Sequence, residues 1–209
     1  MYPLARPWHR PIGLPGAWGA RVDTQSSDAE LARAARHDPQ AFERLYRRHL
    51  PAVFRYVFVR VGAVVDAEDV TSAIFLDVLT SLSHYREQGV FMAWLFTIAQ
   101  RHVGAHHRRR RRDDARTSAI EAADLASFSG NDGASQGRRL EQLDLLARAM
   151  DHLTDDQREA LALRFYGGLK VAEIATVMGK GESAVKMIVH RGLAHLRTAL
   201  AGPGEGAAA

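Results

Sequence analysis

The chain has 209 residues, of which 46% are hydrophobic, and it carries a formal net charge of +4 with a pI of about 9.7. This length suits one or two small domains. No stretch approaches the roughly 18 uninterrupted apolar residues of a membrane span, and residues 1–20 lack the apolar run of a secretory signal. The absence of cysteine excludes disulfides, cysteine-ligated zinc and thiol redox chemistry within the chain. We therefore expect a cytoplasmic protein.

The N-terminal segment, residues 1–26, is predicted to be a disordered extension. Prolines recur every four residues from Pro3 to Pro15, and proline blocks helix formation. A first domain is then predicted for residues 27–112. It opens on Ser27, and Glu30 three residues later completes the pattern of a helix-capping box.

Apolar residues at helical spacing predict three further helices in this domain. The first has Pro39 in its first turn and ends at Gly62. The second is expected to be capped by Asp66 and to run through Leu82. The third is expected to span about residues 91–111, after a break at 85–90.

Residues 113–137 are rich in Ala, Ser, Gly and Asp, which predicts a flexible linker. Fully extended, its roughly 25 residues span about 85 Å, and as a random coil about 28 Å. A second domain is predicted for residues 138–201, followed by a disordered tail at 202–209. Because no segment shows the alternation of a strand, we predict an all-α protein of two small helical domains joined by a flexible linker.

The second domain has the pattern of a helix-turn-helix. A short helix at 171–178 is followed by a turn at 179–181 and a last helix at 182–200, with Val185, Ile188, Val189, Leu193 and Leu196 expected to face inward. The outward residues are then Ser183, Ala184, Lys186, Met187, His190 and Arg191. Lys186 and Arg191 suit base edges or phosphates in a major groove, and Arg164 and Arg197 are candidate phosphate clamps. The alternative is an ordinary helical hairpin with a solvated basic face.

The end of the first domain combines aromatic residues with arginines. The candidates for contact with single-stranded nucleic acid are Tyr85, Arg86, Phe91, Trp94, Arg101, Arg108 and Arg109, the last two within an arginine run at 108–112. The alternative is that Phe91 and Trp94 are core residues and the arginines a solvated tail. His102 and His106 have metal-ligand spacing, but no third ligand is near in sequence, so neither a metal nor a cofactor is expected.

These motifs resemble the extracytoplasmic-function group of bacterial RNA polymerase sigma factors. The resemblance rests on FERLY at 42–46, DAEDVT at 66–71 with Phe75 and Leu76, WLFTIA at 94–99, and the second-domain runs LTDDQR, LRFYGG, VAEIATVMG and SAVKMIVHR. It implies that the first domain, sigma region 2, recognises and melts a promoter −10 element. It also implies that the second domain, sigma region 4, reads a −35 element as duplex.

The resemblance also implies partners. Core RNA polymerase, through its clamp and flap regions, and promoter DNA are expected, together with an anti-sigma factor. The clamp-binding surface would comprise Asp69, Thr71, Ser72, Phe75 and Leu76, and the loop at 85–90 would capture a flipped base. Two departures stand out: Ser72-Ala73 replaces the usual Gln-Glu pair, and His102 replaces an asparagine.

Two other classes of function are the alternatives to a sigma factor. A stand-alone helix-turn-helix regulator would need dimerisation and a sensor as its first domain. An enzyme would need a reactive site, but the carboxylates Asp66, Glu68 and Asp69 fit the electrostatics of a helix start. Neither a nucleophile–base pair nor a phosphate-binding glycine loop appears, so the sequence predicts a protein without catalytic activity.

Overall fold

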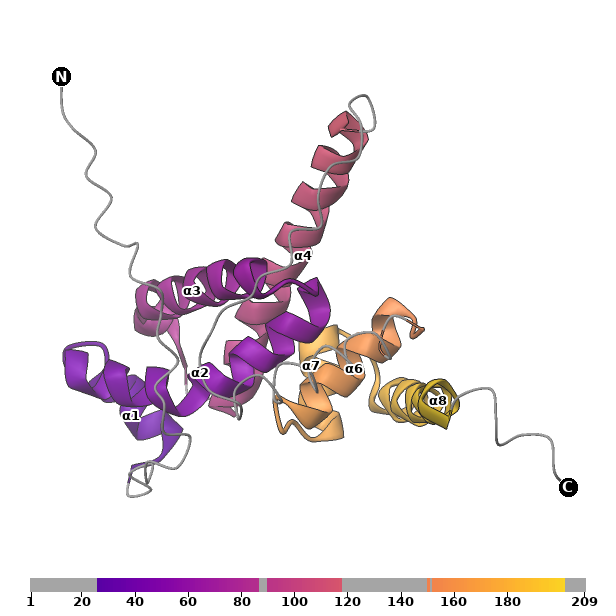
Figure 1. Cartoon of the computed structure of the whole chain (residues 1–209). Coiled ribbons are helices and arrows are strands. Elements are labelled where there is room, and N and C mark those ends of the chain that lie inside the picture. Colours follow the sequence, from indigo (N-terminus) through magenta and orange to yellow (C-terminus); the bar gives the residue numbers. More distant parts are fainter. Residues whose placement is uncertain (1–25, 87–89, 118–149, 151, 202–209) are drawn as a thin grey trace, which may run out of the picture.

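A computed structural model describes residues 26–86, 90–117, 150 and 152–201, with backbone only at 114–117 and 200–201. These residues form seven α-helices and one short 3-10 helix, η1 (Figure 1), which confirms the all-α prediction. Residues 1–25, 118–149 and 202–209 lie outside the described part. The predictions of an N-terminal extension, of most of the linker and of a tail therefore stay predictions.

The first helix begins, and the second helix begins and ends, where the sequence predicts. In α1 (Asp28–Ala34), the Ser27 hydroxyl accepts the Glu30 N–H at 3.2 Å and the Glu30 carboxylate accepts the Ser27 N–H at 2.7 Å. In α2 (Pro39–Val61), the helix ends at Gly62, whose φ of 83° lies in the left-handed region that glycine adopts without strain.

The next two helices differ from the prediction at one end each. α3 (Val64–Ser81) begins before Asp66, with Ala63 at the cap position, so Asp66 lies in the first turn and is not the cap. η1 (Leu82–His84) follows it. α4 (Phe91–Thr117) continues past Arg112, so residues 113–117, predicted as the start of the linker, are helical. This segment contains neither glycine nor proline, and the arginine and alanine within it favour helix.

α2 is the central helix of the first domain. It contacts α1, α3 and α4, and its side chains Leu45, Val53 and Tyr56 are completely or almost completely buried. Phe96 of α4 packs edge-on against the Tyr56 ring, with ring centroids 5.1 Å apart. This packing fixes α3 and α4 side by side.

The second domain consists of α6 (Asp155–Phe165), α7 (Val171–Met178) and α8 (Glu182–Ala201). Thr154 and Gln157 form a capping box, and Gly179, with φ of 63°, forms the predicted turn between α7 and α8. Val185 is completely buried and Ile188, Val189 and Leu196 are partly buried, as predicted. Leu193 is 39% exposed, so its predicted inward position is wrong.

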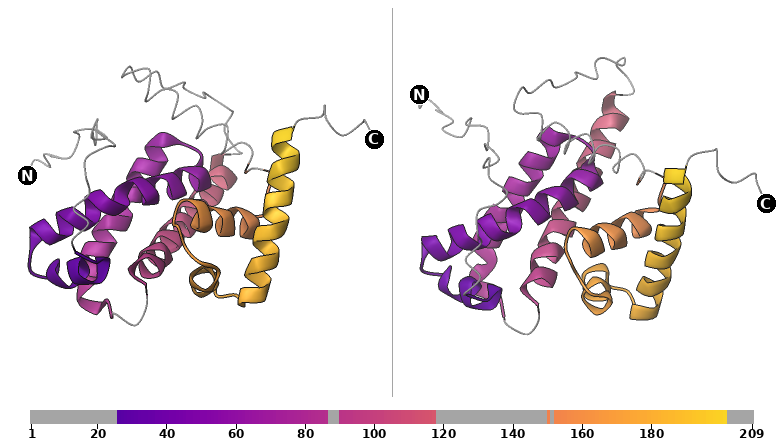
Figure 2. Two further views of the ribbon diagram at one scale, coloured as in Figure 1. Left: turned by 90° about the horizontal axis from the view of Figure 1, so that it is seen from below. Right: turned by 60° about the horizontal axis from the view of Figure 1, so that its bottom comes forward.

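The two groups of helices pack directly against each other. α6 contacts α2, α7 contacts α4, and the buried apolar side chains of both groups form one continuous core. α8 lies at the outer edge of this assembly, on the side away from α1 and α3 (Figure 2). The described structure is therefore a closed arrangement of the two domains.

Candidate nucleic-acid and polymerase interfaces

The outward face of α8 is open to solvent along its whole predicted reading surface. Ser183, Ala184, Lys186, Met187, His190 and Arg191 are all exposed. Among the described residues, Lys186 and Arg191 make neither an ion pair nor a side-chain hydrogen bond. On the inner side, Gly192 is buried, and a Cβ atom there would lie 3.0 Å from Leu161 Cδ1. The helix is thus held close to α6 and presents a small, polar first turn to its surroundings.

The two predicted phosphate clamps differ in their surroundings. The Arg164 guanidinium donates a hydrogen bond from Nη1 to the Leu169 carbonyl at 3.0 Å, which ties the end of α6 to the turn before α7. Arg197 is exposed near the end of α8. Arg164 is also exposed, so it combines a structural contact within the protein with access to solvent.

The aromatic residues around the 85–90 loop form a compact cluster. Ring centroids of Tyr85 and Phe91 are 5.5 Å apart, those of Tyr85 and Trp94 are 4.9 Å apart, and those of Phe91 and Trp94 are 5.6 Å apart. Tyr85 is 3% and Phe91 is 4% exposed, whereas Trp94 is half-buried and Arg86 is exposed. In this conformation the Tyr85 and Phe91 rings are buried and do not present a face to a base.

α4 is tied to α3 by an aspartate that the sequence does not single out. Arg101 Nη2 and His102 Nε2 lie 2.8 and 2.9 Å from the same oxygen, Asp77 Oδ2, and the Ser81 hydroxyl donates to Asp77 Oδ1 at 2.9 Å. The hydrogen bond from His102 is the main reason that the Asp77 pKa is lowered. His102, which replaces the usual asparagine, therefore contacts α3, and Arg101 is held beside it.

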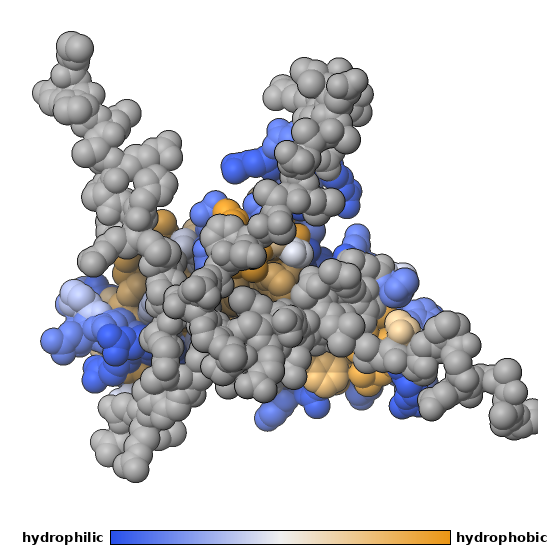
Figure 3. Space-filling model, in the orientation of Figure 1, coloured by the Kyte–Doolittle hydropathy of each residue, from blue (hydrophilic) through white to orange (hydrophobic). Residues whose placement is uncertain are grey.

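The arginine run lies on the part of α4 that projects from the rest of the helices (Figure 1). Arg108 and Arg109, like the other three arginines of the run, are exposed, and hydrophilic side chains gather on this projection in the space-filling view (Figure 3). Arg110 Nη1 and His106 Nε2 each lie 3.8 Å from Asp66 Oδ2. The Arg110–Asp66 ion pair is long, and its side chains are 57% and 39% exposed. It therefore contributes little to stability, and Arg110 can exchange it for a phosphate.

The predicted clamp-binding residues of α3 lie on two different faces. Asp69 and Leu76 are exposed, Leu76 to 65%, and Ser72 is partly exposed. Thr71 and Phe75 are buried, and the Phe75 ring packs edge-on against Tyr46 with centroids 4.7 Å apart. They therefore hold α3 in place and are not available at its surface.

The structure adds two apolar residues to the outer face of α3. Val65 is 58% and Leu79 is 44% exposed. Positions 65, 69, 72, 76 and 79 follow a spacing of four and three residues, which places them on one side of a helix. That spacing is the signal by which sequence reasoning could have found Val65 and Leu79, because such a row of exposed residues marks an interaction surface.

The interface between the domains contains a buried polar cluster. The Tyr56 hydroxyl donates to Glu159 Oε1 at 2.8 Å, and Arg60 Nε lies 3.2 Å from Glu159 Oε2. Burial raises the Glu159 pKa by more than the Arg60 guanidinium and the Tyr56 hydrogen bond lower it. Nearby, Lys180 Nζ lies 3.0 Å from Asp156 Oδ2.

Comparison with known proteins identifies both domains. The family model of sigma-70 region 2 matches residues 45–113, and that of sigma-70, region 4, matches residues 143–196. The chain is 38% identical to the ECF RNA polymerase sigma factor BldN of Streptomyces coelicolor, over 77% of this chain and 61% of that protein. It is 35% identical to the RNA polymerase sigma factor CarQ of Myxococcus xanthus, over 77% and 89%. It is 31% identical to the ECF RNA polymerase sigma factor SigD of Mycobacterium tuberculosis, over 85% of each chain.

Two solved structures share the fold. CnrH, in complex with the cytosolic domain of CnrY, has a TM-score of 0.63 at 24% identity, and the match covers 83% of this chain and 96% of that one. RpoE of Bartonella quintana, in complex with the anti-sigma factor NepR, has a TM-score of 0.64 at 22% identity, with coverage of 78% and 99%.

The chain belongs to the extracytoplasmic-function group of sigma-70 RNA polymerase sigma factors, which are transcription initiation factors and not enzymes. It spans about three-fifths of the length of BldN and most of the length of the other two relatives. Within the described residues, none of the helices combines the length and the apolar character that crossing a membrane requires.

Proposed function

We propose that this sigma factor directs core RNA polymerase to a promoter set through three separate surfaces. The outward face of α8 reads the −35 duplex, α4 and the loop before it hold the −10 single strand, and the outer face of α3 docks on the polymerase clamp. The observation that carries the proposal is the fully exposed polar face of α8 on a buried helix-turn-helix scaffold. A helix so presented has the form that enters a major groove.

The charge and exposure of α4 support its proposed role in holding the −10 single strand. Extruding a base costs a few kcal/mol, and stacking on an aromatic side chain offsets about 1–3 kcal/mol of it. Trp94 is the partly exposed ring of the aromatic cluster. The arginine run beyond it supplies the positive track along which a strand backbone is held.

We propose further that the two domains separate when the protein binds polymerase. A spacing of about one and a half helical turns puts the two promoter elements roughly 50 Å apart, whereas here α6 and α7 pack directly on α2 and α4. The contact that must break is the one between Glu159, Tyr56 and Arg60. The proposed linker, which begins after α4, supplies the reach.

Separation is measurable by energy transfer because the chain has no native cysteine. Dyes on Gln40→Cys and Thr198→Cys, both at exposed positions, report the distance between domains. Transfer should fall when core polymerase is added. Glu159→Ala should lower the energy transfer even without polymerase, because it leaves the buried Arg60 guanidinium without its carboxylate at a cost of about 3–5 kcal/mol. The exposed control Glu43→Gln should leave the energy transfer unchanged. Undiminished transfer in a transcribing complex would contradict separation.

Transcription in vitro tests the function itself. Purified protein with core polymerase should yield promoter-specific transcripts from a genomic promoter library, and the protein alone should bind the same DNA weakly. The alternative, a stand-alone helix-turn-helix regulator, requires a dimer that binds DNA tightly without polymerase. Tight binding without polymerase, with no promoter-specific transcript from the library, would establish that alternative.

Four further expectations complete the proposal. The chain acts in the cytoplasm and without catalysis of its own, and its domains extend over residues 27–112 and 138–201. An anti-sigma factor is proposed as a partner, supported by the complexes in which CnrH and RpoE were solved. The outer face of α3, with Leu76, Leu79 and Val65 exposed, is the apolar surface that such a partner would cover.

A further inference from the structure

Met187 differs in character from the other exposed residues of α8. The outward face of this helix is formed by Ser183, Ala184, Lys186, Met187, His190 and Arg191. Its other members are small, polar or basic, whereas Met187 carries a long apolar side chain and is 50% exposed. Lys186 lies directly before it and Arg191 about one turn after it, and both are exposed. An apolar side chain in this basic setting suits a partner that is anionic overall and carries a local apolar group.

The packing of α8 holds Met187 on the outward face. Val185 is completely buried, and at Gly192, seven residues later, a Cβ atom would lie 3.0 Å from Leu161 Cδ1 of α6. Both residues therefore mark the inner side of α8. At about 100° per residue, Met187 lies about 200° round the helix from Val185, which is nearly the opposite side. A rotation of α8 that buried Met187 would expose Val185, so the fold keeps the Met187 side chain outward.

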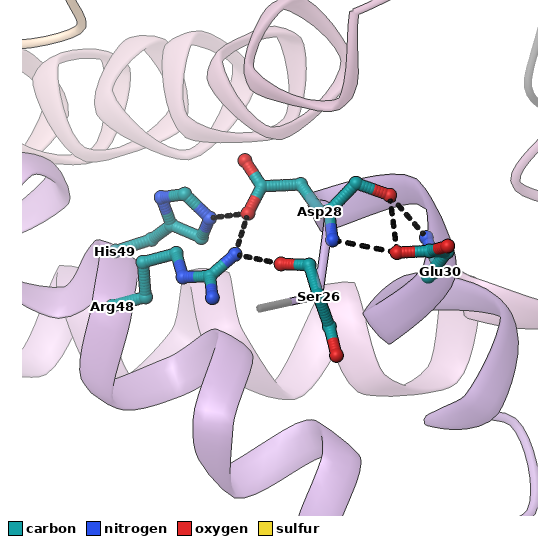
Figure 4. Close-up of polar contacts among 6 residues, drawn as sticks. Ser26, Asp28, Glu30, Arg48 and His49 are labelled. Carbon is teal, nitrogen blue, oxygen red and sulfur yellow. Dashed lines mark hydrogen bonds and ion pairs between the residues drawn. The ribbon is translucent and has the colours of Figure 1, made fainter. Parts of the chain in front are cut away.

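The outward face of α8 differs from a helix face that serves the fold. At the start of α1, Asp28 Oδ1 lies 2.7 Å from Arg48 Nη1 and 3.0 Å from His49 Nε2 of α2 (Figure 4). On α8, the two cations beside Met187 make no ion pair among the described residues, and Met187 itself lies outside the apolar core that these residues form. A change at Met187 can therefore alter binding without altering the fold.

Thymine is the base that an apolar side chain can select. In the major groove every base edge offers hydrogen-bond donors or acceptors, and thymine alone adds a methyl group, at C5. Methionine has no donor and only a weak acceptor, so it gains little from the polar edges of the other bases. Its unbranched thioether chain adapts its shape to a neighbouring group. Contact with the methyl group removes apolar surface of both partners from water.

We infer that Met187 reads the methyl group of a thymine in the −35 duplex and so selects a T·A pair at one position of the element. The inference rests on the proposed function, which places the outward face of α8 in the major groove. Lys186 and Arg191 supply polar contacts beside it, and Met187 supplies the apolar one. Met187 is thus a specificity-determining residue whose contribution depends on a single methyl group.

The test removes that methyl group from the DNA. Holoenzyme assembled from core polymerase and the full chain binds a promoter taken from the genomic library. Each thymine of its −35 region, on either strand, is replaced in turn by uracil, which keeps the pairing and the O4 acceptor and lacks only the methyl group. At one position the substitution should lower the affinity of the wild-type holoenzyme by about fourfold, which corresponds to about 0.8 kcal/mol for one buried methyl group.

The same DNAs are then bound by holoenzymes that carry variants of α8. Met187→Ala should bind the thymine promoter at least about fourfold more weakly than wild type, and uracil at the sensitive position should have no further effect. Met187→Leu keeps an apolar side chain and should retain part of the sensitivity. Leu193→Ala is the matched control, because Leu193 is an apolar residue of the same helix, 39% exposed and outside the outward face. This variant should respond to uracil as wild type does.

The possible failures are distinct. If the wild-type holoenzyme binds duplexes with an unrelated −35 region as tightly as the promoter, α8 does not read the duplex, and the proposed −35 role fails together with the inference. If it prefers the promoter but no uracil substitution weakens binding, the proposed function stands and the inference is wrong. If uracil weakens binding by Met187→Ala as much as by wild type, another side chain contacts the methyl group, and the inference is again wrong. Loss of the sensitivity in Leu193→Ala would show a general effect on α8 and would overturn the inference as well.

Discussion

The two helices that are predicted to contact DNA, α4 and α8, differ in how far their polar side chains are engaged within the protein. On α8, Lys186 and Arg191 are exposed and, among the described residues, unpaired. On α4, Arg101 and His102 are bound to Asp77, and Arg110 lies near Asp66. The side chains of α8 are thus available to a ligand, whereas several side chains of α4 are bound to carboxylates of α3.

This difference matches the two states of DNA that the helices are proposed to bind. Duplex DNA has a fixed groove, so a rigid, preformed helix face suits it. A melted strand has no fixed shape, and its phosphates can take over contacts that Asp77 and Asp66 make in the free protein. Binding on α4 is then an exchange of anionic partners, whereas Lys186 and Arg191 of α8 can meet DNA without giving up a partner among the described residues.

The largest effect is expected from the arginine run of α4. Replacing all five arginines at 108–112 with serine should weaken binding of the holoenzyme to single-stranded −10 DNA by well over tenfold. Each lost phosphate contact removes about 0.7 from the slope of log affinity against log salt on single strands. With five arginines replaced, the slope should therefore flatten by up to about 3.5. It is measured by titrating binding over a series of salt concentrations.

The matched control removes arginines that are equally exposed but lie on α2. Arg44 and Arg47, replaced together by serine, lie off the proposed strand path and should leave the slope unchanged. An unaltered slope in the 108–112 variant would show that the run is merely solvated, and the contrast with α8 would then disappear.

A smaller effect is expected on α8. Arg191→Ala should weaken binding to the −35 duplex by about 1–3 kcal/mol and relax the preference at one base pair, if the guanidinium contacts a base edge. Arg197→Ala, at the end of the same helix, should weaken all duplexes alike because a phosphate contact carries no sequence information. Competition binding against duplexes substituted at each position distinguishes the two. Undisturbed base preference in Arg191→Ala would count against its assignment.

The contrast between α4 and α8 also marks what the sequence can predict. Features with a local signal in the sequence are predicted correctly: the capping box at Ser27, the helix end at Gly62 and the turn at Gly179. The sequence analysis ends α4 too early, because no glycine or proline marks the end of the helix at Thr117. The family motif on α3 includes neighbouring residues, and it does not tell which of them are exposed. Neighbouring residues of a helix point in different directions, so Phe75 is buried and Leu76 is exposed.

Contacts between distant segments leave no such signal. Asp77 and His102 are 25 residues apart, and Tyr56 and Glu159 are 103 apart. Both pairs are ordinary polar residues at helical positions, and nothing in their spacing relates them. They depend on how α3 meets α4 and how α6 meets α2, which is decided by the packing of whole helices. The closed arrangement was unpredictable for the same reason.

The smallest effect is expected from Asp77→Asn, which removes the carboxylate that holds α4. The Asp77 pKa is lowered from 3.8, above all by the His102 hydrogen bond, so the stabilisation is present above pH 3.8 and is lost as the pH falls through the lowered pKa. Because the Arg101 side chain is 65% exposed, the variant should lose less than about 1 kcal/mol of unfolding free energy at neutral pH.

Denaturant unfolding at a series of pH values measures this difference, with Glu43→Gln as the exposed control. The gap between wild type and Asp77→Asn should be constant from neutral pH down to about pH 4 and close below it. The variant should also bind single-stranded −10 DNA slightly more tightly, since Arg101 no longer has to leave a carboxylate, and bind the −35 duplex as before. Equal effects on both DNAs would mean that Asp77 acts on the whole fold, and that α4 is not restrained by it in particular.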